Sequence, residues 1–171
     1  MFKLAYTAPE NATGKIKELY DIFPPQIGVP LPMQLLSASP DMLAQRMDVI
    51  KYYMNHPELD FPILAAIRLI ASTELCFDFC VNLNAGMLQR VGMTGEQVAS
   101  LLGDMADVPF DAKEVALLKL IQKVVRDPKT VSDADVAACR EAGWSDAAIL
   151  DASGQAASMA VPARLMAAFV K

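Results

Sequence analysis

Hydrophobic residues recur along this chain at the three- and four-residue spacing of amphipathic helices, and no segment alternates like a half-buried strand. Helix start signals precede several of these runs, such as Thr94 with Gln97 three residues later. Gly92 and Gly143 follow two of the runs as stop signals. The pattern predicts an all-α fold, with helices near 13–23, 41–55, 62–73, 77–91, 95–103, 112–126, 133–142 and 146–170.

Proline changes this picture at two places. The segment 23–33 contains four prolines, each of which disfavours the helical region for the residue before it. We therefore expect segment 23–33 to be an extended arm or loop. Pro162 interrupts the last predicted helix, which we expect to bend there.

The sequence also resembles itself when it is shifted by 51 positions. Residues 64–70 align with 115–121, and residues 91–94 align with 142–145 without a gap. Each copy is therefore predicted to contain, in order, a helix, a linker, a second helix that ends at a glycine, and a capped third helix. The prediction is an all-α helical bundle with an internal two-fold helical repeat.

A chain of 171 residues can bury about 70% of its unfolded surface in one domain, so a single domain spanning 1–171 is expected. It would comprise an N-terminal helix and Pro-rich arm (1–39), a first half-repeat with two cysteines (40–110) and a second half-repeat (111–171).

The composition is apolar and acidic. Hydrophobic residues make up 54% of the chain and its mean hydropathy is +0.29, which favours a homo-oligomer that hides apolar surface. The net charge of −5, with scattered Lys and Arg, argues against a nucleic-acid partner. The apolar stretches fall short of the roughly 20 residues of a membrane helix. The start of the chain does not resemble a signal peptide, so we expect a cytoplasmic protein without a membrane partner.

Cys76 and Cys80, four residues apart, are the main candidates for covalent chemistry. On a regular helix they share one face with Asn84, and their Cβ atoms lie about 5–6 Å apart. A disulfide needs a separation of about 3.5–4.5 Å. Bridging therefore requires Cys76 to lie in a frayed first turn or in the linker before it. The polar residues 72–74 are expected to provide this break and to cap the next helix.

The residues leave the role of this pair open. The positive end of the helix dipole favours a thiolate, whereas the charges of Glu74 and Asp78 oppose it. The pair is a redox centre, or two small core residues, or part of a metal site. Cys139 and His56 show no ligand spacing relative to the pair. Cys139 is expected to pack in the core, and His56 suits the end of a helix.

Residues 80–88, Cys-Val-Asn-Leu-Asn-Ala-Gly-Met-Leu, and the following Gly92-Met93-Thr94 carry a family resemblance. They resemble the carboxymuconolactone decarboxylase and alkylhydroperoxidase D superfamily, in the branch with Cys-x-x-x-Asn where the founding members carry Cys-x-x-x-His. Residues 116–150 are similar to the second half of that family. The resemblance covers roughly residues 40–170.

The resemblance implies an alkylhydroperoxidase D-like helical bundle that forms a homo-oligomer, from dimer to hexamer. The thiol members of this superfamily reduce peroxides with a Cys-x-x-Cys pair, a His and a Glu. By position, Cys80 matches the attacking cysteine and Cys76 stands near the resolving one. Phe77 occupies the usual place of the resolving cysteine, so this chain has Cys-x-x-x-Cys.

Two further positions depart from the family pattern. Asn84 stands in place of the His, and asparagine forms hydrogen bonds but does not transfer a proton near neutral pH. The glutamate that the family carries about one helix upstream is replaced by alanine in this chain, at Ala65 or Ala66. Glu74 is a nearby titratable carboxylate and is our candidate for the assisting role.

The sequence thus favours a thiol antioxidant protein with peroxidase or disulfide-exchange activity. Cys80 attacks, Cys76 resolves, Asn84 orients and Glu74 assists. The expected partners are a small hydroperoxide and a thiol reductant protein, and no cofactor or metal is expected. The alternative is a non-redox, carboxymuconolactone decarboxylase-like oligomer that binds or transforms a small carboxylate, in a pocket lined by Met47, Met54, Met87 and Phe79.

Overall fold

The computed structural model describes residues 1–171, and the chain divides into two compact units. The first unit comprises Met1–Asn55 and Arg164–Lys171, and the second comprises His56–Ala163. The regular structure is helical throughout, which confirms the predicted all-α class. That the whole chain acts as one domain stays a prediction.

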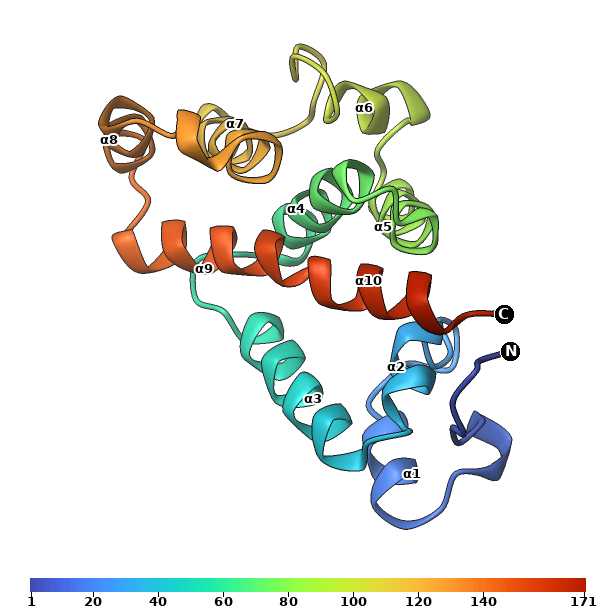
Figure 1. Cartoon of the computed structure of the whole chain (residues 1–171). Helices are drawn as coiled ribbons and strands as arrows, with labels where there is room; N and C mark the ends of the chain where they lie inside the picture. The colour runs from blue at the N-terminus through green and yellow to red at the C-terminus, as the bar shows by residue number, and fades with distance from the viewer. The chain divides into compact units, whose positions relative to one another are not determined.

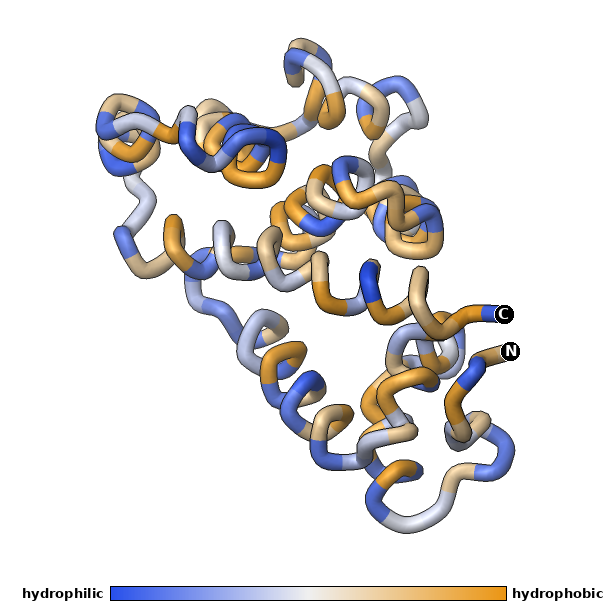
Figure 2. Tube along the Cα trace, viewed as in Figure 1, coloured by the Kyte–Doolittle hydropathy of each residue, from blue (hydrophilic) through white to orange (hydrophobic).

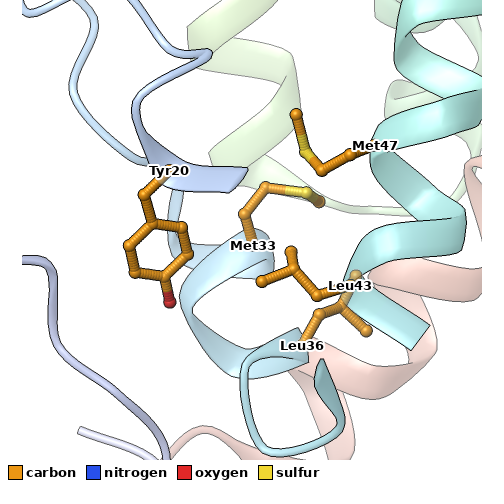
Figure 3. Close-up of a cluster of buried hydrophobic side chains, with 5 residues drawn as sticks. All are labelled: Tyr20, Met33, Leu36, Leu43 and Met47. Carbon is orange, nitrogen blue, oxygen red and sulfur yellow. The ribbon is translucent and has the colours of Figure 1, made fainter. Parts of the chain in front are cut away.

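Three helices build the first unit, after a short 3-10 turn η1 (Pro9–Asn11): α1 (Gly14–Tyr20), α2 (Leu31–Leu36) and α3 (Pro40–Met54). A buried cluster holds them together, and Figure 3 shows its side chains converging from all three helices: Tyr20, Met33, Leu36, Leu43 and Met47. The two ends of the chain lie side by side in this unit, joined by a single antiparallel bridge between Phe2 and Val170 (Figure 1).

The expectation of an extended arm over 23–33 is wrong in part, because α2 begins inside that segment at Leu31. Pro30 is the N-cap of α2, with extended dihedrals (φ −59°, ψ 143°), and Pro32 lies in the first turn. Proline is tolerated there, since the first N–H groups of a helix have no partner within the helix. The two prolines therefore start this helix instead of preventing it.

The second unit contains the predicted repeat. Its seven elements are α4 (Phe61–Glu74), α5 (Asp78–Arg90), α6 (Gly95–Ser100), α7 (Ala112–Arg126), the 3-10 turn η2 (Pro128–Thr130), α8 (Asp133–Glu141) and α9 (Asp146–Ser158). The last helix of the chain, α10 (Ala160–Phe169), begins after them. Helix α4 packs against α5, α7 and α9 (Figure 1). Residues 63–67 and 69–72 of α4 are buried, as expected for a helix that is apolar on nearly every side. Hydrophobic and hydrophilic colours instead lie on opposite sides of α7 in Figure 2.

The two copies of the repeat share their caps as well as their order. Asp60 and Asp111, 51 positions apart, cap α4 and α7, each accepting a hydrogen bond from the backbone N–H three residues later. Thr94 and Ser145 cap α6 and α9 in the same way. These matched side-chain caps support the two-fold repeat inferred from the sequence.

The glycine stops of the repeat also match in backbone geometry. Gly92 and Gly143 have positive φ values of 103° and 97°. Gly92 N–H donates to the carbonyl of Gln89, and Gly143 N–H donates to that of Arg140. The next residue in each copy donates to the carbonyl five positions back, which completes a Schellman motif after α5 and after α8.

We expect Gly143→Ala to lower the free energy of unfolding by about 1–2 kcal/mol, because the left-handed region is costly for a residue with a Cβ. No atom lies within 4 Å of the added Cβ, so the cost is one of backbone strain. Gly86→Ala is the matched control: it also meets nothing within 4 Å but lies inside α5. It should stabilise the protein by about 0.5–1 kcal/mol. Urea denaturation of both variants measures the difference, and equal effects would contradict this account.

The last predicted helix, 146–170, is divided into α9 and α10, and the break falls at Met159 instead of Pro162. Pro162 lies in the first turn of α10, where its missing N–H costs little. Met159 keeps helical dihedrals (φ −66°, ψ −19°) but its N–H bonds to Ala156, which tightens the turn. No helix in the structure is both long and apolar enough to cross a bilayer.

Candidate functional site: the thiol junction between α4 and α5

Helix α4 ends with a Schellman motif in which a cysteine takes the position usual for glycine. Cys76 has φ +50°, its N–H donates to the carbonyl of Thr73, and Phe77 N–H donates to the carbonyl of Ser72. These are the two bonds of that motif. A left-handed conformation costs a residue with a Cβ roughly 1–2 kcal/mol. Such strain at a non-glycine residue is frequent at functional sites.

The break between the helices lies later than the sequence suggested. We expected the polar residues 72–74 to interrupt the helix and to cap the next one, but they form the last turn of α4. Ser72 is fully buried, and Thr73 Oγ1 bonds back to the carbonyl of Leu69 at 2.9 Å. The chain leaves the helix only at Leu75, and no side chain caps α5. The cause is the left-handed turn at Cys76, which the sequence pattern does not reveal.

The two thiols of this junction differ in exposure. Cys76 is exposed, whereas Cys80 lies in the first turn of α5 with 7% of its surface accessible, and neither is in a disulfide. Cys76 lies outside α5, two residues before its first residue, Asp78. This placement meets the condition under which two cysteines four residues apart can approach each other as a disulfide requires.

Asn84 forms two hydrogen bonds, one within α5 and one to α4. Its Nδ2 donates to the carbonyl oxygen of Cys80 at 2.8 Å, and its Oδ1 accepts from Arg68 Nε at 2.9 Å. Asn84 is 2% exposed, and Arg68 is half-buried on α4. The Arg68 guanidinium is therefore bonded to the residue that lies one helical turn after Cys80 in α5. From the sequence, Arg68 is a cation that could approach the thiols from the preceding helix, but it was not among the assigned site residues; it is the only charged residue between Asp60 and Glu74.

Glu74, the last residue of α4, forms an ion pair with Arg126 at the end of α7, with Oε1 2.6 Å from Arg126 Nε. Arg126 also donates through Nη2 to the carbonyl of Leu102. The carboxylate proposed to assist the thiols is thus engaged with α7. Glu74 is only two residues from Cys76 along the chain, and its assisting role stays a prediction.

Arg126 lines an open cleft of about 500 Å³ beside α7. Lys119 and Lys123 line the same cleft from α7. Lys123 lies three residues before Arg126 and Lys119 lies four residues before Lys123, so the three cations share one face of the helix. Two of them have acidic partners, since Lys123 pairs with Asp135 and Arg126 with Glu74. Hydrogen bonds from Lys123 and from the backbone and hydroxyl of Ser132 lower the pKa of Asp135 to about 2.

The other candidate residues lie apart from the thiol junction. Cys139 is fully buried in α8, its Sγ bonds to the carbonyl of Ala116, and burial raises its pKa, which confirms the predicted core role. His56 Nδ1 accepts from the backbone N–H of Glu58 and Leu59, so Nε2 carries the proton and donates to Asp151 at 3.1 Å.

The methionines that we placed around a ligand pocket belong to different units. Met47 is fully buried in the cluster of the first unit, and Met54 is 68% exposed at the end of α3. Met87 and Phe79 are half-buried on α5 in the second unit. The structure brings no group of three His, Cys, Asp or Glu side chains together in the arrangement that a metal ion needs.

The helix order and the repeat are those of an alkylhydroperoxidase D-like fold, and comparison with solved structures confirms this fold. A peroxidase-related protein of uncharacterised function from Silicibacter sp. TM1040 superposes with a TM-score of 0.82 at 15% identity, over 97% of this chain and 87% of that one. An alkylhydroperoxidase AhpD core protein from Ralstonia eutropha JMP134 gives a TM-score of 0.81 at 16% identity, over 98% and 90%.

A third similar structure is the debrominase Bmp8, with a TM-score of 0.79 at 14% identity over 97% of this chain and 89% of that one. A second structure of that debrominase holds 2,3,4-tribromopyrrole. No family model matches the sequence, and a search of curated proteins gives no match. At these identities the likeness establishes the fold of the chain.

Proposed function

We propose that this protein is a thiol-dependent oxidoreductase that reduces small hydroperoxides, with Cys80 as the attacking thiol and Cys76 as the resolving thiol. The observation that carries the proposal is the left-handed Cys76 in the glycine position of the α4 cap. A free cysteine there costs backbone energy, and it stands exposed, four residues before a buried thiol in the first turn of a helix.

The proposed reaction has three steps. The Cys80 thiolate attacks the terminal oxygen of ROOH, the O–O bond breaks, and after protonation the products are Cys80 sulfenic acid and ROH. The Cys76 thiol then attacks Cys80 Sγ, which forms the disulfide and releases water. A dithiol reductant reduces the disulfide by exchange and becomes oxidised itself. The sum is ROOH plus a dithiol giving ROH, water and a disulfide.

Other residues position the thiols in this scheme. Asn84 Nδ2 donates to the carbonyl of Cys80 and so orients the first turn of α5, while Asn84 Oδ1 holds the Arg68 guanidinium. The fixed positive charge would favour the thiolate and the developing alkoxide. Glu74 is the proposed acceptor of the Cys76 proton, because it is the carboxylate two residues before Cys76 in the chain.

Intact mass spectrometry after brief treatment with substoichiometric alkyl hydroperoxide tests the proposal. We expect a loss of two hydrogens, and peptide mapping after alkylation should locate a Cys76–Cys80 disulfide, with Cys139 still reduced. Subsequent treatment with a dithiol should restore both thiols. Cys76 and Cys80 thiols that stay alkylatable after treatment would overturn the proposal.

A small-carboxylate binder is the second candidate, and the cleft beside α7 favours it. Three cations and the carboxylates of Asp104 and Asp127 line that cleft. Lys123 and Arg126 pair with Asp135 and Glu74, so a small carboxylate would bind at Lys119. Unreactive thiols together with saturable binding of a small dicarboxylate, lost in Lys119→Glu, would replace the redox proposal by this one. Lys129→Glu, an exposed lysine that does not line the cleft, is the matched control.

A further inference from the structure

Ser72, in the last turn of α4, carries a buried hydroxyl that no hydrogen bond within the protein reaches. Serine and threonine hydroxyls inside helices commonly bond back to the carbonyl four residues earlier. Thr73, the next residue, does so with Leu69, and Ser153 of α9 does so with Ile149. Because nearly all buried polar side-chain atoms have a partner, the exception at Ser72 calls for an explanation.

Ser72 faces α5 at the level of Cys80. Arg68 lies one helical turn before Ser72 on the same face of α4, and its side chain bonds to Asn84 of α5. Cys80 lies one turn before Asn84 on the same face of α5. The two helices are joined by three residues and pack together, so the chain reverses direction between them (Figure 1). Ser72 and Cys80 therefore lie opposite each other, one turn nearer the junction than this bond.

The backbone of the junction also brings these two residues together. The Ser72 carbonyl accepts from Phe77 N–H at 2.9 Å, and the Phe77 carbonyl accepts from Cys80 N–H at 3.0 Å. Two hydrogen bonds thus connect Ser72 to Cys80 through a single residue. The left-handed conformation of Cys76 permits the first of these bonds, so the strained cap also sets the last turn of α4 against the first turn of α5.

We propose that Ser72 is a further catalytic residue, whose hydroxyl donates a hydrogen bond to Cys80 Sγ when that sulfur is a thiolate. This inference rests on the proposed function, in which Cys80 is the attacking thiol. A thiol sulfur is a weak acceptor, whereas a hydrogen bond to an ionised acceptor is roughly twice as strong as one between neutral groups. The hydroxyl therefore gains its partner when the sulfur loses its proton. It keeps its own proton, because it donates without transferring.

A hydrogen bond that forms only to the charged state favours that state. The thiolate is the nucleophilic form of cysteine, so Ser72 increases the fraction of Cys80 that is ready to react at neutral pH. This chain has asparagine and alanine where the founding members of the superfamily have His and Glu. Ser72 then supplies a neutral hydrogen-bond donor to a site without those two groups.

The pH dependence of Cys80 alkylation by iodoacetamide tests the proposal in the reduced protein, with peptide mapping to separate Cys80 from Cys76. In Ser72→Ala the midpoint of the alkylation profile should rise by about one pH unit, and the rate at neutral pH should fall at least about fivefold. Ser153→Ala is the matched control, because that hydroxyl is already bonded to Ile149. It should leave the midpoint and the rate unchanged. Alkylation needs no peroxide, so it measures the role of Ser72 separately from hydroperoxide reduction.

The charged side chains near the junction are the same in Ser72→Ala and in the unmodified protein. Arg68 and Glu74 belong to α4, Asp78 belongs to α5, and Arg126 of α7 pairs with Glu74. A shift of the midpoint therefore reports the loss of the hydroxyl. Ser72→Thr keeps a hydroxyl and should retain most of the reactivity, with circular dichroism to verify its fold.

Stability separates this catalytic role from a structural one. Ser72→Ala removes a buried hydroxyl without a partner and places a better helix former in α4, so the urea midpoint should rise. The expected variant is more stable and less reactive. An unchanged alkylation profile would overturn the proposal, and so would a joint loss of stability and reactivity, which indicates a structural role. A Cys80 thiol that iodoacetamide leaves unmodified at every pH in the unmodified protein would overturn it as well.

Discussion

Cys80→Ser is expected to lower the consumption of an alkyl hydroperoxide, with a dithiol as reductant, at least about 100-fold, because it removes the group that attacks the peroxide oxygen. Serine is nearly isosteric, so the buried first turn of α5 should be retained. The measurement is the rate of peroxide loss at equal protein concentration. A rate equal to that of the unmodified protein would show that Cys80 is not the attacking thiol.

The resolving thiol gives a different result from the attacking one. Cys76→Asn removes the thiol but suits the φ of +50°, since asparagine enters the left-handed region more readily than most residues. This variant should react once with peroxide and stop at Cys80 sulfenic acid, which a dimedone adduct reveals by its mass. Cys139→Ala is the control for general cysteine loss and should keep the full rate, because Cys139 is fully buried away from the junction. Sustained turnover by Cys76→Asn would contradict the resolving role.

Asn84→Ala is expected to lower the free energy of unfolding by about 2–3 kcal/mol, because it removes the hydrogen bond from the half-buried Arg68 guanidinium and the bond to the carbonyl of Cys80. Asn82→Ala is the matched control, because Asn82 is exposed on the same helix. It should be neutral or slightly stabilising, since alanine favours helix more than asparagine. Urea denaturation measures both, and equal changes would contradict a structural role for the Arg68–Asn84 bond.

A double-mutant cycle isolates this bond from the other contacts of both residues. Arg68→Met combined with Asn84→Ala should show a coupling energy above about 1 kcal/mol, as expected for a hydrogen bond with a charged donor. Asn84→Asp should retain most of the stability, because its carboxylate still accepts from the guanidinium. A coupling energy near zero would mean that each residue acts through other neighbours.

The helices and their caps followed from local sequence. The predicted helix 112–126 coincides with α7, and the glycine stops at Gly92 and Gly143 have the positive φ that the motif requires. Such features depend on residues within about one turn of each other, so the sequence pattern contains them directly. The repeat was visible for the same reason, because both copies keep their caps at one offset. From this pattern and a short thiol motif, the alkylhydroperoxidase D-like fold could be inferred.

The sequence by itself determined most of the helices and the positions of the two thiols along the chain. Only the tertiary structure decided that Cys76 is left-handed, that Arg68 reaches Asn84 across two helices, and that Glu74 binds Arg126. It also decided that Pro30 and Pro32 start α2. Local propensities differ by only about 1 kcal/mol per residue. Packing α4 among three helices outweighs them, and contacts between residues 16 or 52 positions apart have no local signature.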